Sequence, residues 1–307
     1  MADKLEKIKL GIVIVVYHSF ERLVNYVKNE LPKINKGAVT VIVNNASDSG
    51  ECGKLAAACG ACFVENADQQ PLERASVYLI GSKENLGYSR GNNLGSDFLQ
   101  RYFAPQYLLF SNDDISIDSE NIINKLIEEL KKRPGTKMIG PRVISHITGA
   151  DQSPHMVKIS PYRKIAWNFF PYLRKKRKFQ NCFKSPESCE CYWVSGAFFL
   201  IETESFFQVG KFDEEIFLYF EEVILAERLL KKNYKCYFYA DVQVIHDEGA
   251  SSQSISSFKR QLLLNSSCHY YRVYGNYSRF VIWLLQLSDK FNSFFSVNHD
   301  FGNYSNL

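Results

Sequence analysis

The 307-residue sequence predicts an α/β fold, with a largely parallel sheet flanked by helices. Over the first half of the chain, short β-branched apolar runs alternate with stretches of helical periodicity, which is typical of strand–helix–strand units. Each apolar run also ends in small or polar residues, as strands do at the ligand-binding edge of an open α/β sheet. With 46% hydrophobic and 23% charged residues, the chain is able to bury a substantial core.

The first elements follow from apolar runs and helical spacing. Residues 10–17 (LGIVIVVY) are β-branched on both faces, as expected for a central buried strand. Residues 20–31 have a helical pattern, and residues 39–43 (VTVIV) form the next predicted strand. That strand ends in the polar cluster 44–50, which we expect to lie near the end of the first strand.

The next elements carry an acidic pair to the same edge of the sheet. We expect a strand at 77–80, a helix at 88–102 and a strand at 107–110. The last strand is followed at once by Asn112, Asp113 and Asp114. Two adjacent carboxylates repel each other, so the fold must keep them either in open water or beside a cation.

The segment between the predicted strand at 77–80 and its helix is rich in glycine and asparagine. Residues 84–95 read ENLGYSRGNNLG, with a glycine at every fourth position. This pattern suits a loop and helix start pressed against a polar ligand, and it equally suits a glycine-rich turn that caps a helix. It matches neither the dinucleotide-binding glycine motif nor a phosphate-binding P-loop.

The second half contributes three more candidate segments. Residues 192–201 (YWVSGAFFLI) are expected to form a strand interrupted at Ser195 and Gly196, where the backbone approaches another group closely. Glu221 and Glu222 open a predicted helix, where the helix dipole alone would also favour negative charge. A strand at 242–246 ends in His246, a position where a lone histidine is often only structural.

Composition and charge exclude several classes of protein. A net charge of +4 is too small to predict nucleic-acid binding. The first residues lack the long apolar stretch of a secretory signal, and no run approaches the length of a membrane-spanning helix. We therefore expect a reduced cytoplasmic protein in which the C-x-x-C pair Cys59 and Cys62 serves as small core residues.

In the order of these motifs, residues 9–251 resemble a family 2 glycosyltransferase of the GT-A fold, in the branch of bacterial rhamnosyltransferases of surface polysaccharide assembly (O-antigen or capsule). Residues 210–213 also resemble the Gly-x-Phe-Asp motif of this family. The resemblance implies a GT-A domain over 1–251, with a mixed sheet flanked by helices, and a C-terminal helical extension over 252–307. It also implies transfer of a hexosyl or rhamnosyl unit from a dTDP- or UDP-sugar.

The resemblance assigns roles to individual residues. Glu222 is expected to be the catalytic base, with Glu221 as the second choice. Asp114 and His246 are expected to hold Mg²⁺ or Mn²⁺, whose hard oxygen ligands would include the donor diphosphate. The residues expected to bind the nucleotide sugar are Tyr17, Asn44, Asn45, Ser47, Asn85, Gly87, Asn93, Asn112 and Asp113, and those expected at the acceptor are Trp193, Ser195 and Gly196.

These roles predict an inverting enzyme, because one base without a nucleophile permits only a single displacement at the anomeric carbon. Its partners would be a nucleotide sugar and a glycan or lipid-diphosphate-linked acceptor, and not a nucleic acid. Three residues depart from the family pattern, which has aspartate at the positions of Asn44, Glu222 and Ile224. A catalytically weak or silent relative that only binds a nucleotide or glycan is therefore the alternative.

A nucleotidyltransferase on a similar scaffold is a further rival. It would use a metal and paired carboxylates as well, but it would need a basic, glycine-rich loop after the first strand. The sequence VVYHSF at 15–20 contains none.

Two segments outside the motifs have open interpretations. Residues 280, 284, 287, 291 and 294 or 295 lie at helical spacing and predict an apolar stripe that either packs onto the catalytic domain or faces a membrane or partner. The basic run at 174–178 (RKKRK), which follows an aromatic stretch, is either a solvated loop or a contact with an anionic surface. The second options would place a peripheral membrane enzyme at the inner face of the cytoplasmic membrane.

Overall fold

The computed structural model describes residues 9–68, 70–71, 74–118, 121–158, 160–170, 187–247 and 257–295. The strands among them are β1 (Leu10–Tyr17), β2 (Ala38–Asn45), β3 (Cys62–Val64), β4 (Val77–Ser82), β5 (Tyr107–Ser111), β6 (Ile115–Ile117), β7 (Thr136–Ser145), β8 (Cys189–Cys191), β9 (Phe198–Glu202) and β10 (Lys235–His246). The helices are α1 (Phe20–Asn29), η1 (Leu31–Lys33), α2 (Ser49–Cys59), α3 (Gly87–Tyr102), α4 (Ile122–Lys131), α5 (Pro161–Phe169), α7 (Thr203–Gln208), α8 (Glu221–Leu230), α9 (Ser257–Val273) and α10 (Arg279–Phe295).

The strands form one mixed sheet in the order β3-β4-β2-β1-β5-β9-β7-β10-β6, with β8 paired to β10. The pairs β1–β2, β1–β5, β2–β4, β3–β4 and β7–β10 are parallel. Strand β9 runs antiparallel between β5 and β7. The carboxyl ends of β1, β2, β4, β5, β7 and β10 therefore share one edge of the sheet. Because β9 is antiparallel, it begins at this edge, and the residues just before it lie there as well.

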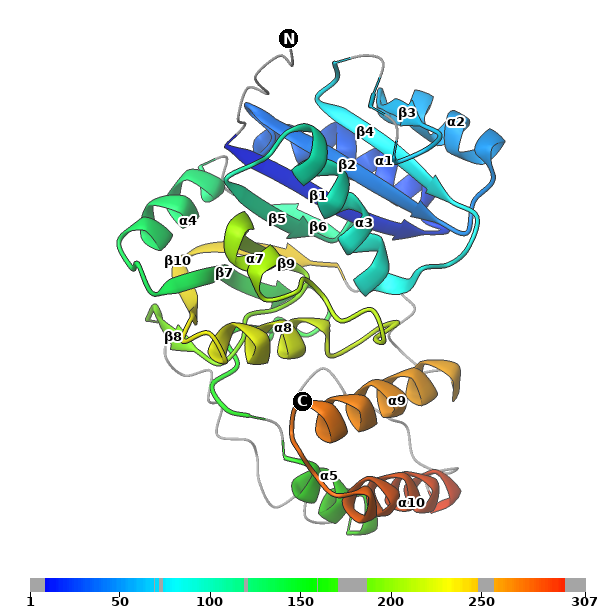
Figure 1. The fold of residues 1–307 in the computed structure, drawn as a ribbon, viewed down its shortest axis with the longest axis vertical. Coiled ribbons are helices and arrows are strands. Elements are labelled where there is room, and N and C mark those ends of the chain that lie inside the picture. The colour runs from blue at the N-terminus through cyan, green and yellow to red at the C-terminus, as the bar shows by residue number, and fades with distance from the viewer. Residues whose placement is uncertain are drawn as a thin grey trace.

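The sheet is covered by helices on both faces, which explains why β1 is apolar on both sides. On one face Ile12, Ile14 and Val16 pack in a core with residues of α1, α2 and α4. On the other face Val13 packs in a second core with α3, α8 and the C-terminal helices. The sheet is thus the middle layer of a three-layer α/β/α arrangement (Figure 1).

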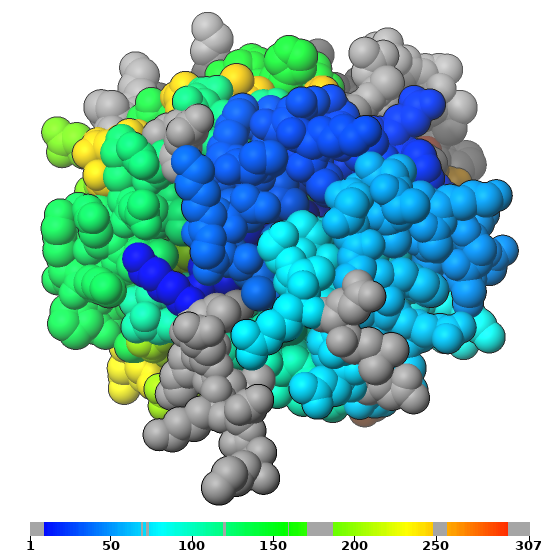
Figure 2. All heavy atoms as spheres, turned by 90° about the horizontal axis from the view of Figure 1, so that it is seen from above, coloured from blue at the N-terminus to red at the C-terminus, as the bar shows by residue number. Residues whose placement is uncertain are grey.

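Helices α5, α9 and α10 gather at one end of the molecule, beyond α8 (Figure 1). Viewed from the opposite end, the surface is formed mainly by the first half of the chain, and the C-terminal helices are almost hidden (Figure 2). Helix α5 packs along α10, where the Asn168 amide donates to the Ser288 hydroxyl at 3.1 Å. No helix among the described residues is long and apolar enough to cross a membrane.

Helix α9 is joined to the sheet domain through two buried carboxylates. Asp213 accepts hydrogen bonds from the His269 imidazole at 2.9 Å and the Tyr274 hydroxyl at 2.7 Å. Burial alone would raise the pKa of Asp213, but these donors hold it well below its usual value. Glu227 of α8 likewise accepts from the Tyr270 hydroxyl at 2.8 Å. The Gly-x-Phe-Asp segment therefore fastens α9 to the rest of the fold.

The predicted strand at 192–201 is wrong in its first half. Strand β9 begins only at Phe198. Residues 192–197 before it do not form a strand, and Trp193 makes only an isolated β-bridge to His155. The strand expected at 242–246 is the end of the longer β10, which starts at Lys235. The basic run at 174–178 lies outside the described residues.

Candidate active site

The carboxyl edge of the sheet collects most of the predicted site residues. Strands β1, β2, β5 and β10 end there in Tyr17, Asn45, Ser111 and His246. In parallel register Tyr17 lies beside Asn45, and Asn45 lies beside Ser82 of β4. The short strand β6 pairs Ile115 with His246, so His246 is held next to the acidic pair that precedes β6.

Asp114 and His246 face each other at this edge. The His246 Nε2 atom lies 3.2 Å from the Asp114 Oδ1 atom. The other ring nitrogen, Nδ1, lies 2.8 Å from the Gln152 Oε1 atom, which only accepts hydrogen bonds, so Nδ1 carries the proton. In this tautomer the Nε2 lone pair points toward a carboxylate oxygen, and a cation between the two atoms would stabilise the arrangement.

The Asp114 carboxylate fits a divalent cation for a second reason. Its Oδ1 atom is buried and has no hydrogen-bond partner among the described residues. An unsatisfied buried carboxylate oxygen is costly, and a metal ion would satisfy it. No cluster of three or more His, Cys, Asp or Glu side chains suited to a metal occurs in the described part of the chain. Asp114 and His246 would therefore hold the ion together with oxygens from water and from a ligand.

Asp113 is engaged by different neighbours. It accepts a short hydrogen bond from the Ser19 hydroxyl, and the Arg22 Nη2 atom lies 2.9 Å from its Oδ1 atom. Burial raises the pKa of Asp113, although Arg22 and Ser19 oppose the rise. Asp113 thus ties the start of α1 to the end of β5, and its carboxylate is occupied by protein groups.

Arg22 is a site residue that the sequence analysis missed. Its second guanidinium nitrogen lies 3.9 Å from the Asp114 Oδ2 atom, and the side chain is half exposed. A guanidinium with open donors beside the candidate metal position suits a phosphate group. The sequence feature that could have indicated Arg22 is its place in the first turn of the helix after β1, only five residues beyond Tyr17.

Glu221 and Glu222 form the first turn of α8, which begins after two strained residues. Tyr219 and Phe220 have φ of 71° and 73°, in the left-handed region that bulky side chains rarely adopt. Burial, together with the neighbouring charge of Glu222, raises the pKa of Glu221 to about 8. Burial also raises the pKa of Glu222. Two partly desolvated carboxyl groups with raised pKa values are typical of an acid–base site.

Glu222 lies beside the Ser195-Gly196 segment. A Cβ atom at Gly196 would lie 3.4 Å from the Glu222 carboxyl carbon, so glycine leaves room at this contact. The Tyr88 hydroxyl donates to the Gly196 carbonyl at 2.9 Å. Burial raises the pKa of Tyr88, and the charges of Glu221, Glu222 and Asp114 raise it further. Tyr88, a second residue that the sequence analysis missed, therefore lies among the three carboxylates that the sequence singled out.

Three of the predicted donor-binding asparagines are bound to protein groups. The Asn44 amide donates to the Cys52 Sγ atom at 3.7 Å, on the α2 side of β2. The Asn45 amide donates to the Gly87 carbonyl at 3.2 Å. The Asn93 amide donates to the Phe212 carbonyl and its oxygen accepts from the Phe212 N–H, both at 3.1 Å. All three are buried and make scaffold contacts, while the Asn45 Oδ1 atom has no hydrogen-bond partner among the described residues.

The glycine at position 87 is required by the backbone. It has φ of 73°, and a Cβ atom there would lie 2.3 Å from the Phe217 carbonyl oxygen. The Tyr88 N–H donates to the same carbonyl at 2.8 Å. The close approach predicted for this loop is therefore to the segment before α8, and it brings α3 and α8 together at the site.

The other predicted residues differ in accessibility. Tyr17 is 52% exposed, so its ring is available to a ligand. Ser47, Asn85 and Asn112 are partly exposed at the same edge, as is Ser195. Trp193 is only 4% exposed and stacks on His155 with ring centroids 4.1 Å apart. The Trp193 ring is thus largely covered by the core, and its contact with an acceptor stays a prediction.

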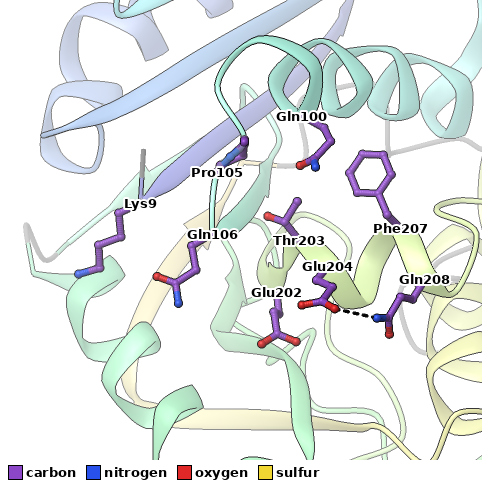
Figure 3. A pocket seen from close by; sticks show the side chains of 10 residues that line it. Lys9, Gln100, Pro105, Gln106, Glu202, Thr203, Glu204, Phe207 and Gln208 are labelled. Carbon is purple, nitrogen blue, oxygen red and sulfur yellow. Dashed lines mark hydrogen bonds between the residues drawn. The ribbon is translucent and has the colours of Figure 1, made fainter. Parts of the chain in front are cut away.

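A cavity of about 660 Å³ lies at the other edge of the sheet, between the starts of β1 and β5 and helix α7 (Figure 3). Its lining combines apolar side chains such as Phe207 with polar ones such as Lys9 and Glu204, and the Glu204 carboxylate accepts from the Gln208 amide at 2.9 Å. Because the amino ends of the strands meet there, this cavity is remote from the acidic residues of the candidate site.

Comparison with known proteins identifies relatives of both sequence and fold. No family model matches the chain. It is 23% identical over 189 residues to the N-acetylglucosaminyl-diphospho-decaprenol L-rhamnosyltransferase of Mycobacterium tuberculosis, covering 58% of this chain and 61% of that protein. It is 24% identical over 266 residues to the low-salt glycan biosynthesis hexosyltransferase Agl10 of Haloferax volcanii, covering 84% and 76% of the two chains. The match thus spans about three fifths of the length of the mycobacterial relative.

Solved structures share the architecture. GalNAc-T7, crystallised with UDP, GalNAc and Mn²⁺, superposes with a TM-score of 0.56 at 16% identity, over 88% of this chain and 49% of that one. The mannosyltransferase PcManGT of Pyrobaculum calidifontis, in complex with GDP-Man and Mn²⁺, gives 0.55 at 11% identity, over 94% and 73%. The predicted GT-A fold is therefore confirmed, as is the resemblance to rhamnosyltransferases.

Proposed function

We propose that this chain, which has the GT-A fold and resembles rhamnosyl- and hexosyltransferases, transfers a sugar from a nucleoside-diphosphate donor to a glycan or lipid-linked glycan acceptor. The proposal depends above all on one observation. Asp114 and His246 lie 3.2 Å apart at the carboxyl edge of the sheet, and burial raises the pKa of a separate carboxylate, Glu222. The charges of Asp114 and Glu222 both raise the pKa of Tyr88, which supports one common site. A nucleotide-sugar transferase needs both groups, one at the leaving diphosphate and one at the attacking hydroxyl.

The donor would lie over the ends of β1, β2 and β5. Asp114 and His246 would hold Mn²⁺ or Mg²⁺, which when bound stabilises the negative charge of the leaving diphosphate. The half-exposed Arg22 guanidinium would bind a phosphate oxygen. The exposed ring of Tyr17, with Ser47, Asn85 and Asn112 nearby at the strand ends, would contact the nucleoside. Either a dTDP- or a UDP-sugar is compatible with these contacts.

The acceptor would lie beside Ser195 and Gly196. Its hydroxyl would give its proton to the Glu222 carboxylate while its oxygen forms a bond to the anomeric carbon. The bond from that carbon to the diphosphate breaks, and its electron pair leaves with the diphosphate. We propose this single displacement, and therefore inversion of the anomeric configuration, because Glu222 acts as a base and no protein nucleophile is assigned.

The relatives narrow the choice of sugar and acceptor. The mycobacterial relative is named for transfer of L-rhamnose to a diphospho-decaprenol carrying N-acetylglucosamine, and the archaeal one for hexosyl transfer in glycan synthesis. We propose a rhamnosyl or hexosyl donor and a lipid-diphosphate-linked acceptor in surface polysaccharide synthesis, at the inner face of the cytoplasmic membrane.

A silent relative that only binds is the second candidate, because Asn44, Glu222 and Ile224 depart from the family pattern. Two of these departures have a structural account. Ile224 is fully buried and packs in the core on the α8 side, and Asn44 hydrogen bonds within the β2–α2 unit. Neither side chain faces the site, so their replacement leaves the candidate metal and base positions intact.

The test is a screen of nucleotide sugars with and without Mn²⁺, with thermal stability and release of the nucleoside diphosphate as readouts. One donor is expected to raise the melting temperature only when the metal is present. Asp114→Ala should lose the metal-dependent stabilisation and reduce turnover by about 10²-fold or more. Glu204→Ala, at the opposite edge of the sheet, is the matched control and should retain both. Donor stabilisation without any turnover on a range of acceptors would favour the silent relative.

A further inference from the structure

Helix α10 exposes a row of large apolar side chains. Phe280, Trp283, Leu287 and Phe291 are 66%, 54%, 41% and 40% exposed. Their spacing of three, four and four residues places them along one side of the helix. The opposite side is buried, since Val281, Leu285 and Ser288 pack against the fold. The outward row is therefore a second apolar face, beyond the one that attaches the helix to the molecule.

Helix α5 extends this surface. It lies beside α10, with the rings of Phe169 and Phe291 5.2 Å apart and those of Tyr162 and Tyr277 5.6 Å apart. Its residue Tyr162 is more than half exposed, and Phe170 just beyond its end is half exposed. Both helices lie at the end of the molecule farthest from β2, β3 and β4 (Figure 1). We call the exposed aromatic and apolar side chains of α5 and α10 the terminal face.

The two helices that carry the terminal face are basic. They contain Arg163, Lys164, Arg279 and Lys290 and one acidic residue, Asp289, a net of +3. Asp289 is buried and paired with Arg260 at 3.1 Å, while Arg279 and Lys290 of α10 are exposed. The terminal face thus presents cations without an exposed carboxylate of its own helices.

We propose that the terminal face docks the protein on the surface of an anionic phospholipid bilayer. The aromatic and leucine side chains would enter the boundary between headgroups and acyl chains, as in amphipathic helices that lie in the membrane plane. Arg279 and Lys290, which are exposed on α10, would contact the anionic headgroups. This inference concerns α5 and α10, which carry no residue assigned to the candidate active site, and it does not depend on the proposed transfer reaction.

Charge and chemistry favour a bilayer over other occupants. A second copy of the chain would bring two basic surfaces together, and like charges repel. A nucleic acid would match the positive charge but would gain little from Leu287 and the other outward apolar groups. An anionic bilayer offers both an apolar boundary layer and negative headgroups. An acidic protein is the competitor that the experiment must separate.

The test is flotation of the purified full-length protein with phosphatidylcholine vesicles, with or without phosphatidylglycerol. Binding is expected only with the anionic lipid, and it should weaken as salt is raised. The double variant Phe280→Ser/Trp283→Ser should bind the anionic vesicles at least about tenfold more weakly than the original protein. Its melting temperature should be unchanged, because both side chains are exposed. Ile147→Ser, which removes an equally exposed apolar residue elsewhere, is the matched control and should bind like the original protein.

Trp283 also provides a direct readout, because its fluorescence should shift to the blue when the ring leaves water. The proposal is overturned if the protein does not float with anionic vesicles, or if the double variant floats as well as the original. Binding to soluble polyglutamate without binding to vesicles would assign the face to an acidic protein instead. Donor-dependent thermal stabilisation without vesicles should be the same in all variants, so failure of docking and failure of the proposed function are distinguishable.

Discussion

Asp113 and Asp114 are adjacent and chemically identical, yet their neighbours give them different tasks. Asp113 is bound by Ser19 and Arg22, which join it to the start of α1. Asp114 keeps one buried oxygen without a hydrogen bond, 3.2 Å from His246. Arg22 relieves the repulsion within the pair, since its guanidinium lies 2.9 Å from Asp113 and 3.9 Å from Asp114, and a cation bound at Asp114 would relieve it further.

Glu221 and Glu222 are also adjacent, and we predict that only Glu222 acts as the base. Glu222→Gln should lower kcat by about 10²- to 10⁴-fold, since the attacking hydroxyl would lose its proton acceptor. Because the pKa of Glu221 is raised to about 8, that group is mostly neutral at pH 7. Glu221→Gln mimics the neutral acid and should reduce kcat by less than about tenfold. Initial rates of the two variants at saturating donor provide the comparison.

The pH dependence checks the same assignment. Burial raises the pKa of Glu222, so kcat/KM should rise with pH at values above the ordinary glutamate pKa of 4.5. The raised pKa of Glu221 in the folded state also makes stability depend on pH. The stability that the neutral Glu221 contributes below pH 4.5 is lost as the pH rises through about 8. Glu221→Gln should therefore gain melting temperature over the original protein across this range. A greater loss of kcat in Glu221→Gln than in Glu222→Gln would make Glu221 the base.

At the scale of elements, the repeated glycines of α3 are explained by packing. A Cβ atom at Gly91 would lie 2.8 Å from Val15 Cγ1, and one at Gly95 would lie 2.7 Å from Val13 Cγ1. Both glycines face β1, one turn apart on the same side of the helix. Gly91 and Gly95 are explained by close packing on β1, which is neither of the two interpretations left open by the sequence, and Gly87 serves the approach to the segment before α8.

We predict that Gly95→Ala destabilises the protein by about 1–3 kcal/mol, because the added methyl group overpacks the interface between α3 and β1. The gain in helix propensity, about 1 kcal/mol, offsets only part of this loss. Gly53→Ala in α2 is the matched control, since no atom lies within 4 Å of its Cβ position and only the propensity gain of about 1 kcal/mol remains. Urea unfolding measures both. Equal or greater stability of Gly95→Ala would show that the interface accommodates the methyl group.

At the scale of the whole molecule, the C-terminal helices are part of the fold and not an appendage. Tyr270 and Tyr271 of α9 are fully buried, and the Ser266 hydroxyl donates to the Leu218 carbonyl at 2.7 Å, just before the strained turn that opens α8. The ring of Phe220 packs against that of Tyr270 at 5.4 Å. Helix α9 therefore supports the segment that positions Glu221 and Glu222, across the boundary expected at residue 251.

We predict that a chain ending after Asp247 does not fold to a stable domain. It would leave Asp213 without His269 and Tyr274, and it would expose the apolar side of α8, so we expect aggregation or loss of cooperative unfolding. A chain ending after Phe295 keeps α9 and α10 and is the control. Soluble yield and circular dichroism during heating are the measurements. A cooperative transition of the shorter chain would instead support an independent domain over 1–251.

Local sequence was sufficient for several elements. The strand at Leu10–Tyr17 and the helix at Gly87–Tyr102 match the prediction within one residue, because their patterns are long and uninterrupted. Strand β7 (Thr136–Ser145) was missed, since Gly140 and Pro141 interrupt its apolar pattern. The first half of β10 was missed for a related reason, as a bulge between Tyr239 and Gln243 breaks its alternation.

The sequence by itself determined the fold class and the edge of the candidate site, because each strand and its polar end are continuous in the chain and parallel strands share one edge. Only the tertiary structure decided which polar groups are free to act. The partners that make this decision are distant in sequence, as Ser19 is from Asp113 and Gln152 is from His246, each pair 94 residues apart. Hydrogen bonds and burial in a folded site depend on such distant neighbours, so the same asparagine or aspartate becomes scaffold or ligand according to what the fold places beside it.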